Sequence, residues 1–429
     1  MGADIVSKLR AAGKRVLWIA HRKELIEQAH DKLEQFGLSV GLIKAGNKPD
    51  PSAPVQVASI QTLARRDITQ LGIDAIVIDE CHRTNAKQYQ RVLETFPSAY
   101  LLGLTATPVR LDGKGLGDNY DSMVVAAKYG DLIEDGFIVP IKTLAPHVPD
   151  TSQLRRQAGD FKVGQSEQLM ANAKIKGNVL DTWLQRGRGR PTVGYACTVD
   201  HAKEMSEAFC AAGVKSTYLT GESPKLEREL ALKSLADGTF EVIWNVEILT
   251  EGWDSDVVSC GIVARPTESL ALHMQIGGRF CRAAPGKVYG LLLDHAGNTT
   301  ERHGMVQMDR EWSLDKSPPK RDEGIAPIRT CGDCFAVYPS GMKACPDCGV
   351  IPEITLKEIL ADETQEMREV TAQSIVTSSK KARMHYWMAM VTEAERHSYK
   401  GGWAKWKYKD KFGSWPTADI MRCRVHRAK

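Results

Sequence analysis

Short apolar runs alternate with amphipathic stretches along the first part of the chain. Fully buried parallel strands read as short runs of β-branched and aliphatic residues. Four such runs predict strands at residues 16–20, 55–59, 75–78 and 100–104. Apolar side chains at helical spacing predict helices at 4–12 and 23–36, and Gly13 ends the first of them. This alternation predicts a doubly wound α/β lobe with a parallel sheet.

The same pattern returns after a polar stretch at 146–168, which is predicted as a linker. Five further apolar runs predict strands at 192–196, 216–219, 241–245, 261–264 and 288–293. Mixed charges and Pro318-Pro319 predict a second linker at 313–327. We therefore expect a first lobe, a second lobe, a cysteine-rich element and a basic, aromatic module, at residues 1–145, 169–312, 328–352 and 353–429.

Composition is that of a soluble globular protein, with 42% hydrophobic and 26% charged residues. No apolar run approaches the ~18 residues of a membrane span, and the first residues do not form a signal peptide. Ten cysteines, scattered except for one cluster, indicate a reducing compartment. We expect a cytoplasmic protein with no membrane association.

Positive charge is concentrated at the carboxyl end. The net charge is +4, but residues 380–429 hold 13 Lys/Arg and 4 Asp/Glu, which is +9 and leaves −5 for the rest. A basic tail on a nearly neutral body indicates a polyanionic partner. A solvated terminal helix would have the same composition.

The main candidate for chemistry is Asp79-Glu80-Cys81-His82, directly after the strand at 75–78. Open α/β sheets bind ligands at the carboxyl ends of their strands. There, Asp79 can hold Mg²⁺ through water and Glu80 can orient or deprotonate an attacking water. An acidic pair after a strand can also be only a solvated loop start. Thr105 and Thr107 follow the next strand and can hydrogen-bond the acidic pair, although a turn before Pro108 is the simpler interpretation.

A second candidate is the stretch from Gln275 to Arg282. Arg279 and Arg282 are three residues apart and are predicted to share one face of a helix. Two arginines so placed can neutralise charge on a transferring phosphoryl group. The alternative is that they pair with surface carboxylates.

The order of these motifs resembles the superfamily 2 DEAD/DEAH-box helicases of the RadD-like and bacteriophage type. Residues 79–82, 104–108 and 275–282 resemble motifs II, III and VI, and 19–25, 59–62 and 250–254 resemble motifs Ia, Ib and V. The stretches 265–269 and 294–298 give the closest match. The resemblance covers about residues 1–300. It implies two RecA-like lobes that hydrolyse ATP with Mg²⁺ between them and act on nucleic acid, DNA more than RNA.

The resemblance also implies roles for individual residues. The catalytic set is Asp79, Glu80, His82, Gln275, Arg279 and Arg282, and the nucleotide contacts are Thr105, Thr107, Gly252 and Asp254. Contacts with the nucleic-acid strand are implied for His21, Arg22, Gln61, Thr62, Thr198 and Thr250. Phosphate oxygens accept hydrogen bonds from such side chains, although a structural role for His21 is equally reasonable. Partners would include single-stranded-DNA-binding, replication or repair proteins in a bacterial or phage-infected cell.

One motif of the family is missing from the sequence. The phosphate-binding loop reads Gly-x-x-x-x-Gly-Lys-Ser/Thr, and none of Gly13-Lys14, Gly113-Lys114 and Gly286-Lys287 has this context. In the family the loop lies just ahead of the helix expected at 4–12, so we expect a first lobe truncated at its amino end. Two alternatives to a helicase remain: a non-hydrolysing nucleic-acid-binding remnant, and the motor subunit of a restriction system. No Asp…Glu-x-Lys nuclease pattern supports the second.

Four cysteines form a second strong signal. Cys331 and Cys334 are followed by Cys345 and Cys348 in two Cys-x₂-Cys pairs. This spacing predicts a structural Cys₄ zinc ribbon. An iron–sulfur site or unliganded thiols are the alternatives. So small an element cannot bury enough core to fold alone, so a bound metal would supply folding energy.

Lysines and aromatic residues interleave between 402 and 416. Trp403, Lys405, Trp406, Lys407 and Lys409 are candidates for nucleic-acid binding, because tryptophans can stack on bases beside a phosphate track. The alternative is a small helical module whose own core holds Trp403, Trp406 and Phe412. Both can hold if the lysines face outward.

The missing phosphate-binding loop generates a prediction. We expect the 429-residue chain to hydrolyse ATP poorly or not at all, because the β- and γ-phosphates lack both the backbone cradle and the lysine. A nucleic-acid-stimulated phosphate-release assay tests this. Turnover at ordinary helicase rates that disappears in Glu80→Gln would contradict it.

Overall fold

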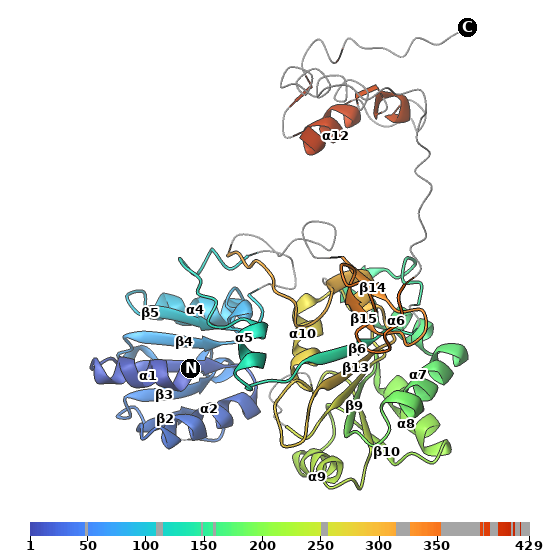
Figure 1. The fold of residues 1–429 in the computed structure, drawn as a ribbon. Coiled ribbons are helices and arrows are strands. Elements are labelled where there is room, and N and C mark those ends of the chain that lie inside the picture. Colours follow the sequence, from blue (N-terminus) through green and yellow to red (C-terminus); the bar gives the residue numbers. More distant parts are fainter. Residues whose placement is uncertain are drawn as a thin grey trace. The chain divides into compact units, whose positions relative to one another are not determined.

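The computed structural model describes residues 1–47, 50–108, 115–146, 149–157, 160–249, 256–314, 327–352, 387–388, 390–394, 402–412, 415–416 and 421. The chain forms two compact units, Met1–Glu353 and Ile354–Lys429 (Figure 1). The larger unit contains two α/β lobes and the cysteine-rich element. No helix in these ranges is both long and apolar enough to cross a membrane.

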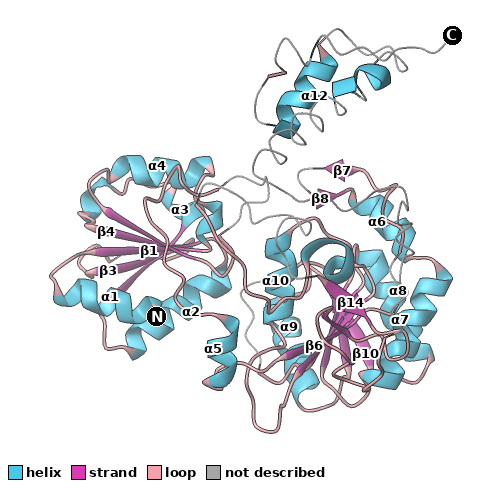
Figure 2. Ribbon diagram, turned by 45° about the horizontal axis from the view of Figure 1, so that its top comes forward, coloured by secondary structure: helices cyan, strands magenta, loops and turns pink. Residues whose placement is uncertain are grey.

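The first lobe is a five-stranded parallel sheet in the order β2-β3-β1-β4-β5. These strands are β1 (Val16–Ala20), β2 (Val40–Ile43), β3 (Val55–Ser59), β4 (Ala75–Asp79) and β5 (Tyr100–Leu104). Helices α1 (Gly2–Ala11) and α2 (Lys23–Gln35) lie on one side of the sheet, and α3 (Ile60–Leu63) and α4 (Lys87–Thr95) on the other (Figure 2). Short 3₁₀ turns occupy Thr69–Leu71 and Cys81–Arg83. The predicted doubly wound lobe is confirmed.

The sheet of the first lobe is buried on both faces. Every residue of β1 and β3 is buried, as continuous apolar runs in a parallel sheet require. One apolar cluster gathers around Leu17 and Ile76, and a second around Trp18 and Val57. Adjacent residues of a strand thus point to opposite faces, and each face is covered by its own helices.

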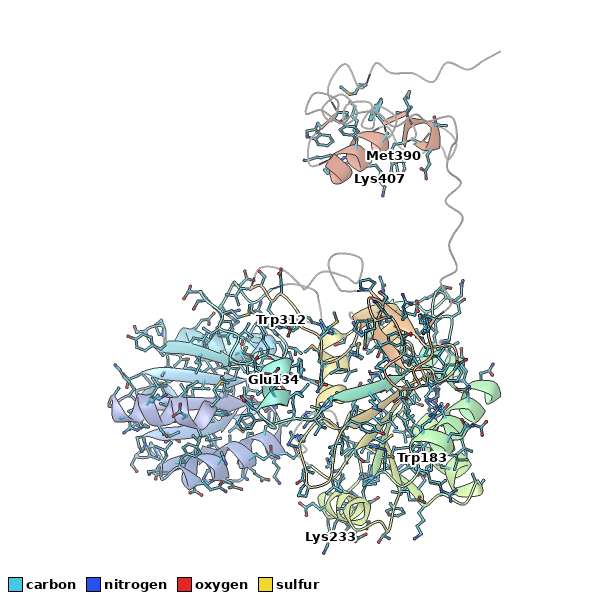
Figure 3. The ribbon with its side chains drawn as sticks, in the orientation of Figure 1. Glu134, Trp183, Lys233, Trp312, Met390 and Lys407 are labelled. Carbon is cyan, nitrogen blue, oxygen red and sulfur yellow. The ribbon has the colours of Figure 1, made fainter. Side chains whose placement is uncertain are left out.

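The second lobe has a six-stranded parallel sheet in the order β10-β11-β9-β12-β13-β6. Its strands are β6 (Ile141–Leu144), β9 (Thr192–Tyr195), β10 (Ser216–Leu219), β11 (Val242–Asn245), β12 (Cys260–Val263) and β13 (Gly290–Asp294). Its helices are α5 (Tyr129–Glu134), α7 (Ala173–Arg186), α8 (Val199–Ala211), α9 (Lys225–Ala236), α10 (Leu270–Gly278) and a π-helix at Asn298–His303. Trp183, a residue of α7, is fully buried (Figure 3), and its indole N–H donates to Thr192 Oγ1 at 2.9 Å.

Two predicted boundaries are wrong. Strand β6 lies in the second sheet, where Ile141 to Leu144 pair with Gly290 to Leu293, so the first lobe ends before the predicted residue 145. The predicted linker at 146–168 contains the hairpin β7 (Arg156–Gln157) and β8 (Asp160–Phe161) and the start of α6 (Val163–Met170). Phe161 and Met170 are buried, so this segment packs on the second lobe. Most of the linker predicted at 313–327 lies outside the described residues.

The cysteine-rich element is a hairpin of β14 (Ile328–Thr330) and β15 (Val337–Pro339). It does not stand apart, because Cys331, Ala336 and Tyr338 belong to the same apolar cluster as Trp183 and Trp244 of the second lobe. In the smaller unit, α12 (Trp403–Phe412) packs Ala404 and Tyr408 against Trp387.

The close approach of β5 to the turn after β4 generates a stability prediction. A Cβ at Gly103 would lie 2.6 Å from Cys81 Sγ and 2.7 Å from the Tyr120 ring. Gly103→Val should therefore lower the free energy of unfolding by about 1–3 kcal/mol through overpacking. Urea denaturation followed by fluorescence measures this. Gly130→Ala in α5 is the matched control, since nothing lies within 4 Å of a Cβ there, and an equal loss in both variants would contradict the prediction.

Candidate active site

The acidic turn sits at the carboxyl end of β4. Asp79 is the last residue of the strand, and its Oδ1 accepts the backbone N–H of Glu80 at 3.0 Å. Glu80 has a φ of 53°, in the left-handed region. That region costs a non-glycine residue on the order of 1 kcal/mol and is often occupied at functional sites. The backbone reverses here at the residue predicted to act on water.

Glu80, His82 and Thr105 meet at this turn. Glu80 Oε2 lies 3.3 Å from His82 Nδ1, and Thr105 Oγ1 lies 3.4 Å from Glu80 Oε2 and 3.5 Å from His82 Nδ1. The pairing of Asp79 with Leu104 across β4 and β5 places Thr105 beside the acidic pair. The geometry thus agrees with the contact expected between the acidic pair and Thr105.

Thr105 also organises the turn that follows it. Its Oγ1 accepts the Thr107 N–H at 3.0 Å and lies 3.1 Å from the Thr107 carbonyl oxygen. The single hydroxyl proton can go to Glu80 or to that carbonyl oxygen, but not to both. Thr107 is fully buried, and its own hydroxyl has no hydrogen-bond partner among the described residues. A change at Glu80 can therefore alter the Thr105 turn.

Buried side chains hold the acidic turn in place. The Tyr120 hydroxyl lies 2.8 Å from Thr84 Oγ1, which donates to the Cys81 carbonyl oxygen at 2.6 Å. Burial raises the pKa of the Cys81 thiol to about 12, so Cys81 stays a thiol and packs rather than reacts. The tight fit at Gly103 completes this support.

The candidate nucleic-acid contacts of the first lobe come directly after β1 and β3. Ala20 pairs with Ser59, so both strands end at the same edge. Gln61 Nε2 donates to the His21 carbonyl oxygen at 2.9 Å, and Ser59 Oγ donates to Gln61 Oε1 at 2.6 Å. Arg22 is the N-cap residue of α2, and Thr62 lies half-buried in α3. The residues expected to contact nucleic acid in this lobe thus share the sheet edge that carries Asp79.

The predicted helical arginine pair needs a correction. Helix α10 ends at Gly278, Arg279 is its C-cap residue, and Arg282 lies beyond it in a bridge with Ile138. Phe280, two residues beyond the helix, is fully buried, and a Cβ at Gly261 would lie 2.2 Å from its ring. Gln275 is half-buried within α10. The arginines therefore come from an irregular segment, and burial lowers the pKa of Arg282.

The remaining predicted contacts in the second lobe divide into two groups. Thr198 caps α8, where its Oγ1 accepts the His201 N–H at 3.1 Å and also hydrogen-bonds Glu167. Its hydroxyl is therefore already engaged in the fold. Thr250, Gly252 and Asp254 lie outside the described residues.

The structure assigns contacts to the stretches 265–269 and 294–298 and adds Asp160, which lies in the segment predicted as a linker. Asp160 accepts hydrogen bonds from Thr267 Oγ1 and the Glu268 N–H, both at 2.7 Å. Asn298 Oδ1 accepts the Thr267 N–H at 2.9 Å. Arg265 also forms an ion pair, with its Nη1 2.7 Å from Glu247 Oε1. These contacts join the stretches 265–269 and 294–298 to the segment predicted as a linker. The resemblance picked out two of these stretches, but hydrogen bonds between single polar residues have no fixed sequence spacing, so the sequence could not show that Asp160 joins them.

The four predicted metal ligands come together. Their sulfurs lie within 4.8 Å of one another, with Cys331–Cys348 and Cys334–Cys345 at 3.6 Å. Tetrahedral zinc with Zn–S bonds of about 2.3 Å holds sulfurs about 3.7 Å apart, so the set fits a single zinc ion. Backbone N–H groups of Cys334 and Asp333 lower the pKa of Cys331 to about 7, whereas burial raises that of Cys334 to about 12. A bound metal would favour the thiolate form of each.

The cysteine cluster is fixed to the second lobe. Ala145 N–H donates to the Phe335 carbonyl oxygen at 3.0 Å, and Leu144 bridges Ala336. Lys142 Nζ lies 2.6 Å from Asp347, which raises the pKa of the lysine. The predicted ribbon therefore continues the edge of the second sheet at β6.

Comparison with known proteins agrees with this arrangement. Residues 1–110 match the family described as type III restriction enzyme, res subunit, and residues 175–284 match the helicase conserved C-terminal domain. A 51.5 kDa protein of Lactococcus phage (isolate 7-9) is 28% identical over 350 residues, which cover 81% of this chain and 74% of that protein. The chain belongs to the superfamily 2 helicases.

Other helicase relatives are longer than this chain. A Saccharomyces cerevisiae protein that bears the name ATP-dependent helicase IRC3 is 27% identical, over 68% of this chain and 44% of its own length. The EcoAI type I restriction endonuclease subunit of Escherichia coli is 31% identical, over 66% of this chain and 40% of its own length. The chain thus spans less than half of these two relatives. Among solved structures, S. cerevisiae Dbp5 bound to RNA and ADP BeF3 has a TM-score of 0.44, 16% identity, and coverage of 66% of this chain and 71% of that one.

The docked cysteine cluster generates a metal prediction for this helicase. Purified protein should carry about one zinc per chain, and Cys348→Ser should release it. Because the ribbon packs into the core of the second lobe, loss of metal should also lower the melting temperature of that lobe. Elemental analysis and calorimetry measure both. Cys210→Ser, at an exposed cysteine of α8, is the matched control. Iron with visible absorbance, or no metal at all, would refute the zinc assignment.

Proposed function

We propose that this helicase-family protein is the motor part of an ATP-dependent translocase or helicase that acts on nucleic acid, with DNA the expected substrate. The observation that carries the proposal is the contact of Glu80 with His82 and Thr105 at 3.3 and 3.4 Å. The contact links Glu80, which is expected to act on water, to the turn at Thr105, which is expected to respond to the bound nucleotide. The shared edge of Asp79, His21 and Gln61 supports it.

Each site residue then has a distinct task. Asp79 would hold Mg²⁺ through water, and the metal would neutralise charge on the phosphates. Glu80 orients the attacking water and accepts its proton, while His82 and Thr105 fix the carboxylate. Arg279 and Arg282 supply positive charge for the phosphoryl group. Zinc at the four cysteines would be structural, since four protein ligands leave no open position.

A second candidate is a nucleic-acid-binding protein that does not hydrolyse ATP, because residues 1–429 contain no Gly-x-x-x-x-Gly-Lys-Ser/Thr sequence. Without the lysine and the backbone cradle, the lobes could bind nucleic acid without turnover. A restriction motor is a third candidate, favoured by the EcoAI relative. The choice of DNA over RNA is supported by the relatives whose names refer to restriction enzymes.

A comparison of two proteins tests the motor function. One is this chain, and the other carries a Gly-Lys-Thr phosphate-binding loop segment ahead of it. Nucleic-acid-stimulated hydrolysis in the second alone supports the proposal. Glu80→Gln in that protein should abolish hydrolysis but retain nucleotide binding, because Asp79 remains to hold the metal. Nucleic-acid binding without hydrolysis in both proteins would favour the remnant instead.

Thr105 provides a sharper prediction for the loop-bearing protein. Thr105→Val removes the hydroxyl that positions Glu80. Loss of this hydrogen bond should cost about 1 kcal/mol, which corresponds to a roughly fivefold to tenfold fall in kcat. KM for ATP should stay unchanged, because Thr105 acts through Glu80. Steady-state kinetics measures both constants. Thr95→Val, at a half-buried threonine whose hydroxyl donates to the Arg91 carbonyl oxygen within α4, should change neither constant. An equal effect of both variants would count against the positioning role.

A further inference from the structure

The helix α12 of the smaller unit has two unlike faces. Ala404 and Tyr408 are buried against Trp387, with the Trp387 and Tyr408 ring centroids 6.1 Å apart. Trp403 packs partly against the same cluster. Trp406 lies on the opposite face and is 65% exposed. The predicted aromatic set therefore divides: Trp403 contributes to a core, Trp406 does not, and the Phe412 side chain lies outside the described residues.

Trp406 is paired with a second exposed tryptophan. The ring of Trp415, itself 48% exposed, lies 5.2 Å from the Trp406 ring at 72°. The ammonium of Lys409 lies 5.5 Å from the Trp406 centroid and 4.5 Å from that of Trp415. A cation over two aromatic rings holds them together at the surface. Two adjacent indoles left in water are costly and mark a binding surface more often than a folding element.

Charge around the pair narrows the class of ligand. Lys405 and Lys407 are exposed on the same helix, and Lys407 lies 5.7 Å from the Trp403 ring. Aromatic faces beside ammonium groups match a ligand that offers flat rings and regularly spaced negative charge. Unpaired nucleotides offer both, whereas an acidic peptide offers the charge alone. In a duplex the base faces are already stacked inside and cannot reach the indoles.

We propose that Trp406, Trp415 and Lys409 form a stacking site for the unpaired bases of single-stranded nucleic acid. One or two bases stack on the indole faces, while Lys405, Lys407 and Lys409 neutralise the neighbouring phosphates. The site lies outside both lobes and uses no nucleotide chemistry. It can therefore fail while the proposed motor function stands, and the reverse is also true.

The test uses the full chain and two labelled probes, an oligo-dT strand and a duplex of equal length, without ATP. Trp406→Ala and Trp415→Ala should each weaken oligo-dT binding about fivefold to a hundredfold, as expected when a base loses its stacking partner. Duplex binding should change less than about twofold, because its bases are not accessible. Trp406→Phe should keep most of the affinity, since a phenyl ring still stacks. Fluorescence anisotropy measures all of these.

Matched controls separate stacking from general effects. Phe36 in the first lobe is also exposed and has Lys32 at 5.9 Å from its ring, so Phe36→Ala should leave oligo-dT affinity unchanged. Lys409→Gln should lower the slope of log K against log salt by about one. Lys233→Gln, at an exposed position of α9, should not alter it.

Two results would overturn the proposal. One is oligo-dT affinity within about twofold of the unmodified chain in both tryptophan variants, a range too small for a lost stacking contact. The other is an equal loss of oligo-dT and duplex binding together with a lower melting temperature, which would make the pair a structural element.

Discussion

The candidate active site around Glu80 and Thr105 depends on the alignment of parallel strands in the first lobe. Because the strands run in one direction and in register, their carboxyl ends form a single row. Residues that are 25 positions apart, such as Glu80 and Thr105, become hydrogen-bond partners at that row. The close approach of Gly103 to Cys81 and Tyr120 keeps the row compact. A bulky side chain there would press on Cys81 and so disturb the acidic turn without contacting Glu80 or Thr105 directly.

Much of the fold could be predicted because buried parallel strands leave a strong local signature. The runs at 16–20, 55–59 and 75–78 became β1, β3 and β4 almost unchanged. The first lobe was extended to residue 145, and no strand was predicted at 141–144, because the partner of β6, β13, lies far away in the sequence. The arginine pair was misplaced because the spacing of Arg279 and Arg282 suits a helix, whereas α10 ends at Gly278, after two successive glycines that favour a helix poorly.

The candidate site could be predicted where chemistry follows a strand or has fixed spacing. Asp79 and Glu80 met the first condition, and the four cysteines met the second. The network of Asp160, Thr267 and Asn298 met neither, because each is a single polar residue whose partners come from other parts of the chain. Trp415 was missed for a related reason: it lies beyond the helix of Trp406, and only the folded chain brings the two rings together.

The contact between the cysteine ribbon and β6 has a consequence for the order of folding. Lys142 and Asp347 are 205 positions apart in the sequence, and contacts of such separation close late because a long loop must be ordered first. During synthesis, the strand emerges from the ribosome well before the cysteines that cover its end. The end of β6 therefore stays uncovered by the ribbon until nearly all of the larger unit has been made.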